Sequence, residues 1–126
     1  MARVTGLGGI FFKARDPQAL SAWYAQHLGL KVEEFGGTLF FDDSAQPGYI
    51  VWSPFKDDTK YFEPSAKPFM INFRVDDLEA LLAALRGAGV QVDAKVDKSE
   101  YGAFGWIMDP EGNRLELWEP PAAKQP

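Results

Sequence analysis

The order of apolar and polar positions in residues 9–32 repeats in residues 70–92. Each copy begins with a short alternation of apolar and other residues, which predicts a β-strand, and continues with apolar residues at helical spacing. A further apolar stretch closes the copies at Val32 and Val92 and predicts a second strand in each. The repeat therefore predicts that the chain consists of two similar units.

Both predicted helices have recognisable ends. Asp16 stands where the first helix should begin, and Asp76 or Asp77 where the second should begin, because an aspartate side chain accepts a hydrogen bond from a free backbone N–H of the first turn. Pro17 suits the first helical position of the first copy. Gly29 and Gly89 mark the expected helix ends, since glycine readily adopts the left-handed conformation that closes a helix.

Additional strand signals follow each predicted helix. In the first copy, apolar runs at residues 38–43 and 49–54 are separated by a segment rich in turn-forming residues. In the second copy, the runs at residues 104–109 and 114–120 flank the sequence PEGN, which predicts a tight hairpin turn. Each unit therefore has the pattern βαβββ. We expect a single domain over residues 1–126, composed of a first module at 7–55, a linker at 56–68, a second module at 69–120 and a disordered tail at 121–126.

A single βαβββ unit leaves one edge of its sheet unpaired and one face uncovered. Two units can combine their sheets and leave the shared inner face open to a ligand. We therefore expect an α+β fold, in which two tandem βαβββ modules form a curved, partly closed mixed sheet with the helices outside.

Composition and charge narrow the classes of function. The chain contains no cysteine, which excludes a disulfide framework and a thiolate site. Its net charge of −5 argues against a nucleic-acid partner and is consistent with a cationic ligand. Because no apolar run is long enough to span a bilayer and the N-terminal residues do not resemble a signal peptide, we expect no membrane partner and a cytoplasmic location.

Three stretches of the sequence resemble the vicinal oxygen chelate superfamily, which includes glyoxalases, bleomycin-resistance proteins and extradiol dioxygenases. They are WYAQHLGL at 23–30, RVDDLEALLAALRGAGV at 74–90 and DPEGNRLELWEP at 109–120. The resemblance covers roughly residues 7–120 and includes the paired βαβββ units. It implies that the protein forms a homodimer, because members of this superfamily commonly pair across a two-fold axis.

The resemblance also implies four positions for metal ligands, on the first and last strands of each module. These positions hold Gly9, Ile50, Met70 and Glu116, of which only Glu116 offers a donor suited to a hard or borderline divalent metal. His27 is the single histidine of the chain and falls near the end of the first predicted helix, where a cation is favourable. We therefore expect no metal cofactor, with Glu116 as the one surviving candidate ligand.

Alternation along the strands assigns the remaining side chains of the inner face. The opposite, helix-facing set is purely apolar: Ile10, Phe12, Ile71, Phe73, Leu115 and Leu117. The candidate ligand-binding residues are Phe11, Ile50, Trp52, Met70, Asn72, Arg74, Tyr101 and Trp118. Two alternatives stay open: the tryptophans pack inside the sheet or in a dimer interface, and Glu116 forms a structural ion pair with Arg74 or Arg114.

The linker carries more aromatic character than a plain connection needs. Tyr61 and Phe62 lie between the modules, and we hypothesise that they fold over one end of the ligand cavity. Packing of the linker on the sheet is the simpler alternative. Residues 99–106 form a second segment capable of a sharp bend, at Gly102 and Gly105.

Three functions are consistent with these observations. The protein binds a small organic molecule without a metal, it is a lyase, isomerase or dioxygenase of the same superfamily with Glu116 as base or metal ligand, or it is a non-catalytic interaction module. We favour small-molecule binding, because three of the four metal positions lack a suitable donor. Metal-dependent catalysis is disfavoured for the same reason, and metal-free proton transfer by Glu116 stays open.

Overall fold

A computed structural model describes residues 2–3, 7–46 and 48–122, so most of the predicted tail lies outside the described residues. Its elements are α1 (Pro17–Leu28), β1 (Ile71–Arg74), α2 (Leu78–Gly87), β2 (Asp97–Ser99), β3 (Gly102–Met108) and β4 (Arg114–Glu119). Helices and a mixed sheet in one small chain confirm the α+β class. Within the described ranges, no helix has the length and apolar character needed to cross a bilayer.

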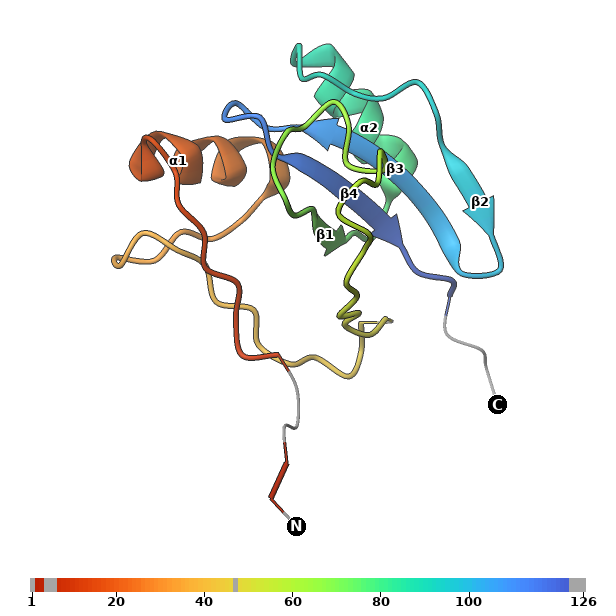
Figure 1. Cartoon of the computed structure of the whole chain (residues 1–126), viewed down its shortest axis with the longest axis horizontal. Coiled ribbons are helices and arrows are strands. Elements are labelled where there is room, and N and C mark those ends of the chain that lie inside the picture. The colour runs from red at the N-terminus through yellow and green to blue at the C-terminus, as the bar shows by residue number, and fades with distance from the viewer. Residues whose placement is uncertain (1, 4–6, 47, 123–126) are drawn as a thin grey trace.

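The sheet is built by the second module alone. Its four strands lie in the order β1-β4-β3-β2 (Figure 1), with β1 parallel to β4 and the other neighbours antiparallel. The order β1–α2–β2–β3–β4 has the predicted βαβββ pattern, but the second strand lies at Asp97–Ser99, and Val92, where it was expected, forms only an isolated bridge to Ile107. The PEGN turn joins β3 to β4, and its ends are tied by a hydrogen bond from the Asp109 N–H to the Asn113 carbonyl oxygen.

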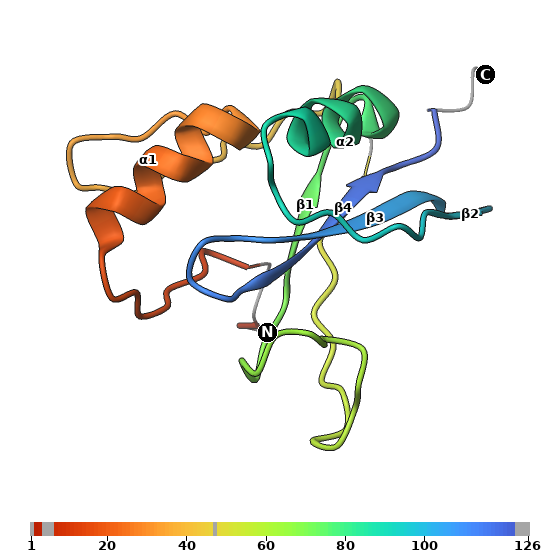
Figure 2. The ribbon, with the colours of Figure 1, turned by 90° about the horizontal axis from the view of Figure 1, so that it is seen from above.

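Both helices lie on the same face of this sheet, as Figure 2 shows. The core between helices and sheet contains Leu20 and Tyr24 of α1, Leu82 of α2, and Leu115 and Leu117 of β4. Leu115 and Leu117 are completely buried, and each such burial contributes about 1.5–3 kcal/mol to folding. The predicted helix-facing positions of the second module are thereby confirmed.

The predicted helix boundaries hold closely. Asp16 and Asp77 cap α1 and α2, because each side chain accepts a hydrogen bond from the backbone N–H three residues later. Gly29 ends α1 in the left-handed conformation, with φ of 74°. The α2 helix ends slightly earlier than predicted, at Gly87, and Gly89 follows with a positive φ.

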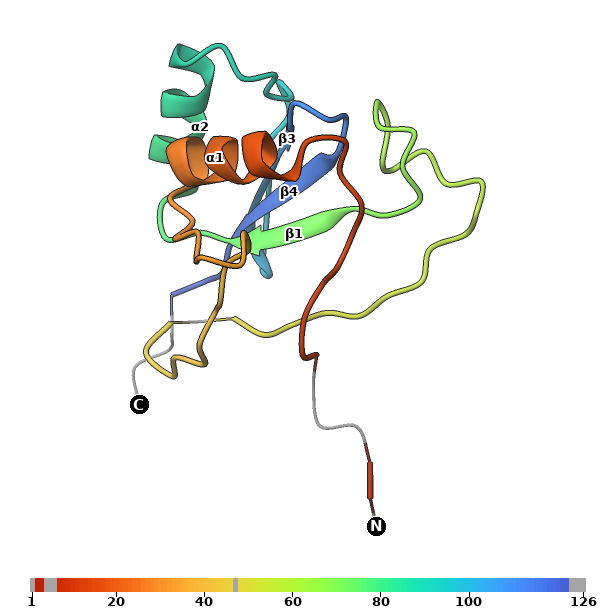
Figure 3. The same ribbon diagram turned by 90° about the vertical axis from the view of Figure 1, so that its left-hand side faces the viewer.

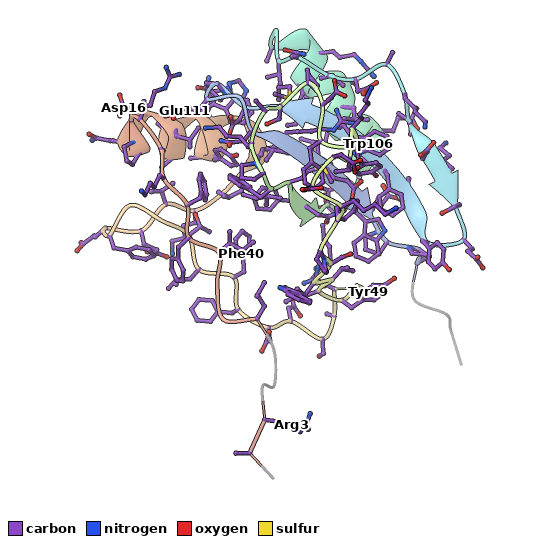
Figure 4. All side chains as sticks on the ribbon, in the orientation of Figure 1. Arg3, Asp16, Phe40, Tyr49, Trp106 and Glu111 are labelled. Carbon is purple, nitrogen blue, oxygen red and sulfur yellow. The ribbon has the colours of Figure 1, made fainter. Side chains whose placement is uncertain are left out.

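Side chains of the second module fix α1, although α1 belongs to the first. The Tyr24 hydroxyl donates to Asp109 Oδ2 over 2.7 Å, in a buried contact. The backbone N–H groups of Arg15 and Asp16 donate to the two carboxylate oxygens of Glu111, over 2.7 and 3.0 Å. The labelled side chains of Asp16 and Glu111 lie together at the start of α1 in Figure 4.

The rest of the first module differs from the prediction. Residues 9–13, 38–43 and 49–54 are extended, but in the described part of the chain they form no strands. Phe11, Phe41 and Trp52 have exposed fractions of 95%, 82% and 80%, and Ile10 and Phe12 also stay outside the core. The physical reason is that a strand needs a hydrogen-bonding neighbour, and these segments have no strand neighbour among the residues that the structure describes. The sheet is therefore open at β1, whose free edge is seen in Figure 3.

Candidate functional site

A row of three polar side chains crosses the centre of the sheet. Asn72 of β1 and Trp106 of β3 are both register partners of Glu116 of β4. Because side chains alternate along a strand and Leu115 and Leu117 face the helices, Glu116 faces the other way. We call Asn72, Glu116 and Trp106 the polar row, and the side of the sheet that carries it the binding face.

Three donors hold the Glu116 carboxylate. Asn72 Nδ2 donates to Oε1 over 2.8 Å, and Trp106 Nε1 donates to Oε2 over 2.9 Å. The Tyr61 hydroxyl donates to the same Oε2 over 2.5 Å. Hydrogen bonds to an ionised acceptor are stronger than neutral ones, so these contacts offset the cost of burying Glu116, which is 9% exposed. The carboxylate is thus fixed as an acceptor at the middle of the binding face.

The linker brings Tyr61 to this carboxylate. Figure 2 shows residues 55–68, in yellow-green, on the side of the sheet opposite the helices. The Tyr61 ring meets the Trp106 ring edge-on at 6.2 Å and also contacts Phe55 and Phe62. Ser65 anchors the end of the linker by donating to the Gly112 carbonyl oxygen over 2.6 Å. Tyr61, one of the two residues of the hypothesised lid, therefore covers Glu116 directly.

Burial raises the pKa of the Tyr61 hydroxyl well above its usual value. The hydrogen bond to Glu116 raises this pKa further, and the positive charge of Arg114 opposes the rise. The phenol therefore stays protonated and remains a donor.

Arg114 lies beside the polar row, on β4, the strand that carries Glu116. Its guanidinium carbon is 5.4 Å from the centre of the Trp106 ring, and its Nη1 is 3.5 Å from Asp93 Oδ2. The Arg114 side chain is 9% exposed, and its Nε has no hydrogen-bond partner among the residues that the structure describes. Arg114 therefore pairs with Asp93 and stacks on the Trp106 ring. The N–H of the same indole donates to Glu116, so the Arg114 cation and the Glu116 carboxylate both contact Trp106.

A second aromatic group extends the binding face. Trp118 is 4% exposed and stacks on Phe104 with the ring centres 6.0 Å apart. Its Nε1 donates to the Tyr101 carbonyl oxygen over 2.7 Å, so Tyr101 takes part through its backbone while its side chain is exposed. Tyr49 approaches Trp118 edge-on at 5.1 Å.

The other predicted site residues are not all brought together. Phe11, Ile50 and Trp52 are largely exposed on the first module, because their predicted strands are unpaired. Met70 precedes β1 and is half-buried, and Arg74 is exposed at the end of β1. Figure 4 shows the labelled Phe40 and Tyr49 below the sheet, away from the helices. The site in one chain thus consists of second-module and linker residues.

Sequence reasoning missed Trp106, which is the structural partner of Glu116. A signal was available, because the PEGN hairpin fixes the register of the two strands that it joins. Counting back from the turn pairs Trp106 with Glu116 and Phe104 with Trp118. Asp109 is buried at the start of this turn and accepts hydrogen bonds from the N–H groups of Glu111 and Asn113.

The donor set at the superfamily's metal positions does not fit a divalent ion. Glycine and isoleucine supply no side-chain donor at 9 and 50, and Met70 supplies only a thioether. The oxygens of Glu116 accept hydrogen bonds from an amide, an indole and a phenol. No group of three histidine, cysteine, aspartate or glutamate side chains gathers within the described ranges. His27 lies in the last turn of α1, as predicted, and contacts the Trp23 ring at 5.0 Å.

Two hollows of about 250 and 240 Å³ occur elsewhere on the molecule. One lies beside Trp23 and His27 of α1, and the other lies between Leu30, Phe40 and Phe73. Neither is lined by Glu116. We place the candidate site at the polar row because the buried Glu116 and Trp106 converge there with Asn72.

Comparisons with known proteins agree with this fold. A family model described as a glyoxalase-like domain matches residues 9–118. TnmS3, an antibiotic binding protein from Streptomyces sp. CB03234, is similar with a TM-score of 0.61 at 18% identity, over 95% of this chain and 99% of its own. The oxidase ChaP-H2 is less similar in structure, with a TM-score of 0.47 at 19% identity, over 86% of this chain and 87% of its own. No curated protein matches the chain significantly.

Proposed function

Because the chain belongs to the glyoxalase-like domain family, within the vicinal oxygen chelate superfamily, we propose that it binds a small organic molecule on the binding face without a metal centre. The observation that carries this proposal is the buried Glu116 carboxylate, fixed by Asn72 and Trp106 from the two neighbouring strands. A preorganised acceptor between aromatic side chains is typical of a small-molecule site. The likeness to TnmS3, itself described as an antibiotic binding protein, supports the same class of function.

We favour binding over proton transfer by Glu116. Two donors of the sheet hold the carboxylate independently of the linker, Asn72 on Oε1 and Trp106 on Oε2. The Tyr61 hydroxyl adds a third hydrogen bond, on Oε2. Glu116 therefore acts as an anchor in this arrangement, and metal-dependent lyase or dioxygenase chemistry lacks its ligands.

We also propose a homodimer. β1 is the edge strand of the sheet, so one row of its backbone groups has no strand neighbour within the described chain. The first module carries extended segments whose aromatic side chains, Phe11, Phe41 and Trp52 among them, are largely exposed. A second copy offers a complementary edge strand and complementary apolar segments. Their pairing satisfies the unpaired backbone groups of β1 and covers the exposed aromatic side chains.

Thermal unfolding tests the binding proposal. Chelator-treated protein is heated with planar aromatic compounds, and separately with nickel, zinc, manganese and iron(II). We expect at least one aromatic compound to raise the unfolding midpoint, because a ligand that binds only the native state stabilises it. The increase should be lost in Glu116→Gln and kept in Glu100→Gln, an exposed control. A midpoint raised only by a metal, and no longer raised in Glu116→Gln, would contradict the proposal.

A further inference from the structure

Tyr61 differs from the other groups that hold Glu116 in where it comes from. Asn72 and Trp106 belong to strands on either side of β4 and are fixed by the sheet register. Tyr61 comes from the linker, and its side chain is 42% exposed. The polar row is therefore complete without Tyr61, and the phenol is an addition to it.

The geometry points to Tyr61 as an internal ligand: we propose that the polar row recognises a hydroxylated aromatic ring, and that such a ligand binds by displacing the Tyr61 phenol. This inference rests on the proposed function and specifies its ligand class. The phenol shows the mode of recognition, with its hydroxyl on Glu116 Oε2 and its ring edge-on to Trp106 at 6.2 Å. An external ring with the same donor makes the same two contacts.

The local charge favours a neutral donor over a bare cation. Arg114 stacks on the indole ring that also donates to Glu116, so positive and negative groups share this part of the face. An ammonium group brings a second cation beside Arg114, whose charge Asp93 already pairs, whereas a phenol donates to Glu116 without taking a further charge out of water. The buried Nε of Arg114 supplies a further donor, which no acceptor in the described residues takes up.

Competition with Tyr61 sets the direction of the key effect. A tethered group occupies its site at a high effective concentration, so an external ligand binds only to the fraction of molecules in which Tyr61 has left. The apparent dissociation constant is the intrinsic one divided by that fraction. Removing Tyr61 therefore strengthens binding, whereas removing a lid that contacts the ligand weakens it. The two roles of Tyr61 predict opposite results.

Calorimetric titration with 2-naphthol and 2-methoxynaphthalene tests the inference, since only the naphthol donates a hydrogen bond. We expect 2-naphthol to bind at least about tenfold more tightly than the methyl ether, the scale of one hydrogen bond to a charged acceptor. Tyr61→Ala should tighten 2-naphthol binding by about tenfold or more if Tyr61 occupies the site nine-tenths of the time. Tyr61→Phe, which keeps the ring and loses the donor, should change affinity in the same direction. Phe35→Ala, at an exposed phenylalanine in the turn beside α1, serves as the control.

The variant Tyr61→Ala/Glu116→Gln separates this inference from the proposed function. Loss of the preference for 2-naphthol in that variant, with the Tyr61→Ala single variant still selective, supports recognition by Glu116. Equal affinity of Tyr61→Ala for both compounds overturns the inference while leaving aromatic binding intact. Weaker 2-naphthol binding in both Tyr61→Ala and Tyr61→Phe also overturns it, in favour of a lid. Absence of binding by either compound to any variant overturns the inference, whereas the proposed function is judged by its own compound panel.

Discussion

The Tyr24 hydroxyl donates to Asp109 Oδ2 over 2.7 Å, and both side chains are 6% exposed. This bond joins α1 of the first module to the hairpin turn of the second. Asn113 Nδ2 donates to the same Asp109 oxygen over 2.7 Å, and the N–H groups of Glu111 and Asn113 donate to Oδ1. One buried carboxylate therefore fixes the turn between β3 and β4 and the position of α1 on the sheet.

Tyr24→Phe should destabilise the protein without changing its fold. The variant keeps the ring in the core and removes one hydrogen bond to a buried carboxylate, which costs about 1.5–3 kcal/mol of the free energy of unfolding. Urea unfolding followed by circular dichroism measures this loss. Tyr101→Phe, at an exposed tyrosine, should change stability by less than about 0.5 kcal/mol. Equal losses in the two variants would contradict the assigned role of Tyr24.

Alkaline titration should distinguish Tyr24 and Tyr61. Burial, and then the hydrogen bonds to Asp109 and Glu116, raise the pKa of both hydroxyls above their usual value of 10.0. A folded-state pKa above the unfolded value contributes stability below about pH 10, and that stability is lost as the pH rises further. We expect the phenolate absorbance of these two groups to appear only above pH 10, together with unfolding. Loss of one late-titrating group in Tyr61→Phe identifies Tyr61, and full titration of the native protein near pH 10 would refute the assignment.

The start of α1 should depend on pH in the acid range. The backbone N–H groups of Asp16 and then of Arg15 lower the pKa of Glu111 below its usual value of 4.5. A lowered folded-state pKa contributes stability above that value, and the contribution is lost as the pH falls through the folded-state pKa. The protection factors of the Arg15 and Asp16 amides, which compare hydrogen exchange with the intrinsic rate at each pH, should therefore fall on acidification in the wild type. Glu111→Gln should show low protection already at neutral pH with a smaller acid response; an identical pH profile would argue against this contact.

The sequence predicted both helices and the β3–β4 hairpin, the elements that carry local signals in the sequence. Asp16, Asp77 and Gly29 mark the ends of the helices, because capping depends on the residue itself and its near neighbours in the chain. The alternation around Leu115 and Leu117 identifies the buried face of β4. The repeat also predicted strands in the first module, but strand formation depends on a partner and not only on local preference. Trp52 fits the pattern of a strand and is largely exposed in the single chain. The contact between Tyr61 and Glu116 spans 55 positions and depends on the path of the linker, which periodicity does not encode.

The exposed aromatic side chains lead to a prediction about assembly. Phe11→Asp places a charge on an extended segment that we expect to pair with a second copy, and it should weaken dimerisation by at least about tenfold, or 1.4 kcal/mol. Sedimentation equilibrium over a range of concentrations measures this change. Phe11→Leu, which stays apolar, should retain most of the dimer. A wild-type protein that remains monomeric at every concentration would contradict the proposed homodimer.

The most direct test of the central proposal follows the indole N–H resonances of the four tryptophans in ¹⁵N-labelled, chelator-treated protein during titration with 2-naphthol. Trp106→Phe assigns the resonance of the indole that donates to Glu116. Binding on the binding face predicts a saturable shift of the Trp106 resonance in the absence of metal, with the Trp23 resonance of α1 unchanged. A saturable shift of Trp23 with Trp106 unmoved, or a Trp106 shift that requires added metal, would contradict metal-free binding at the polar row.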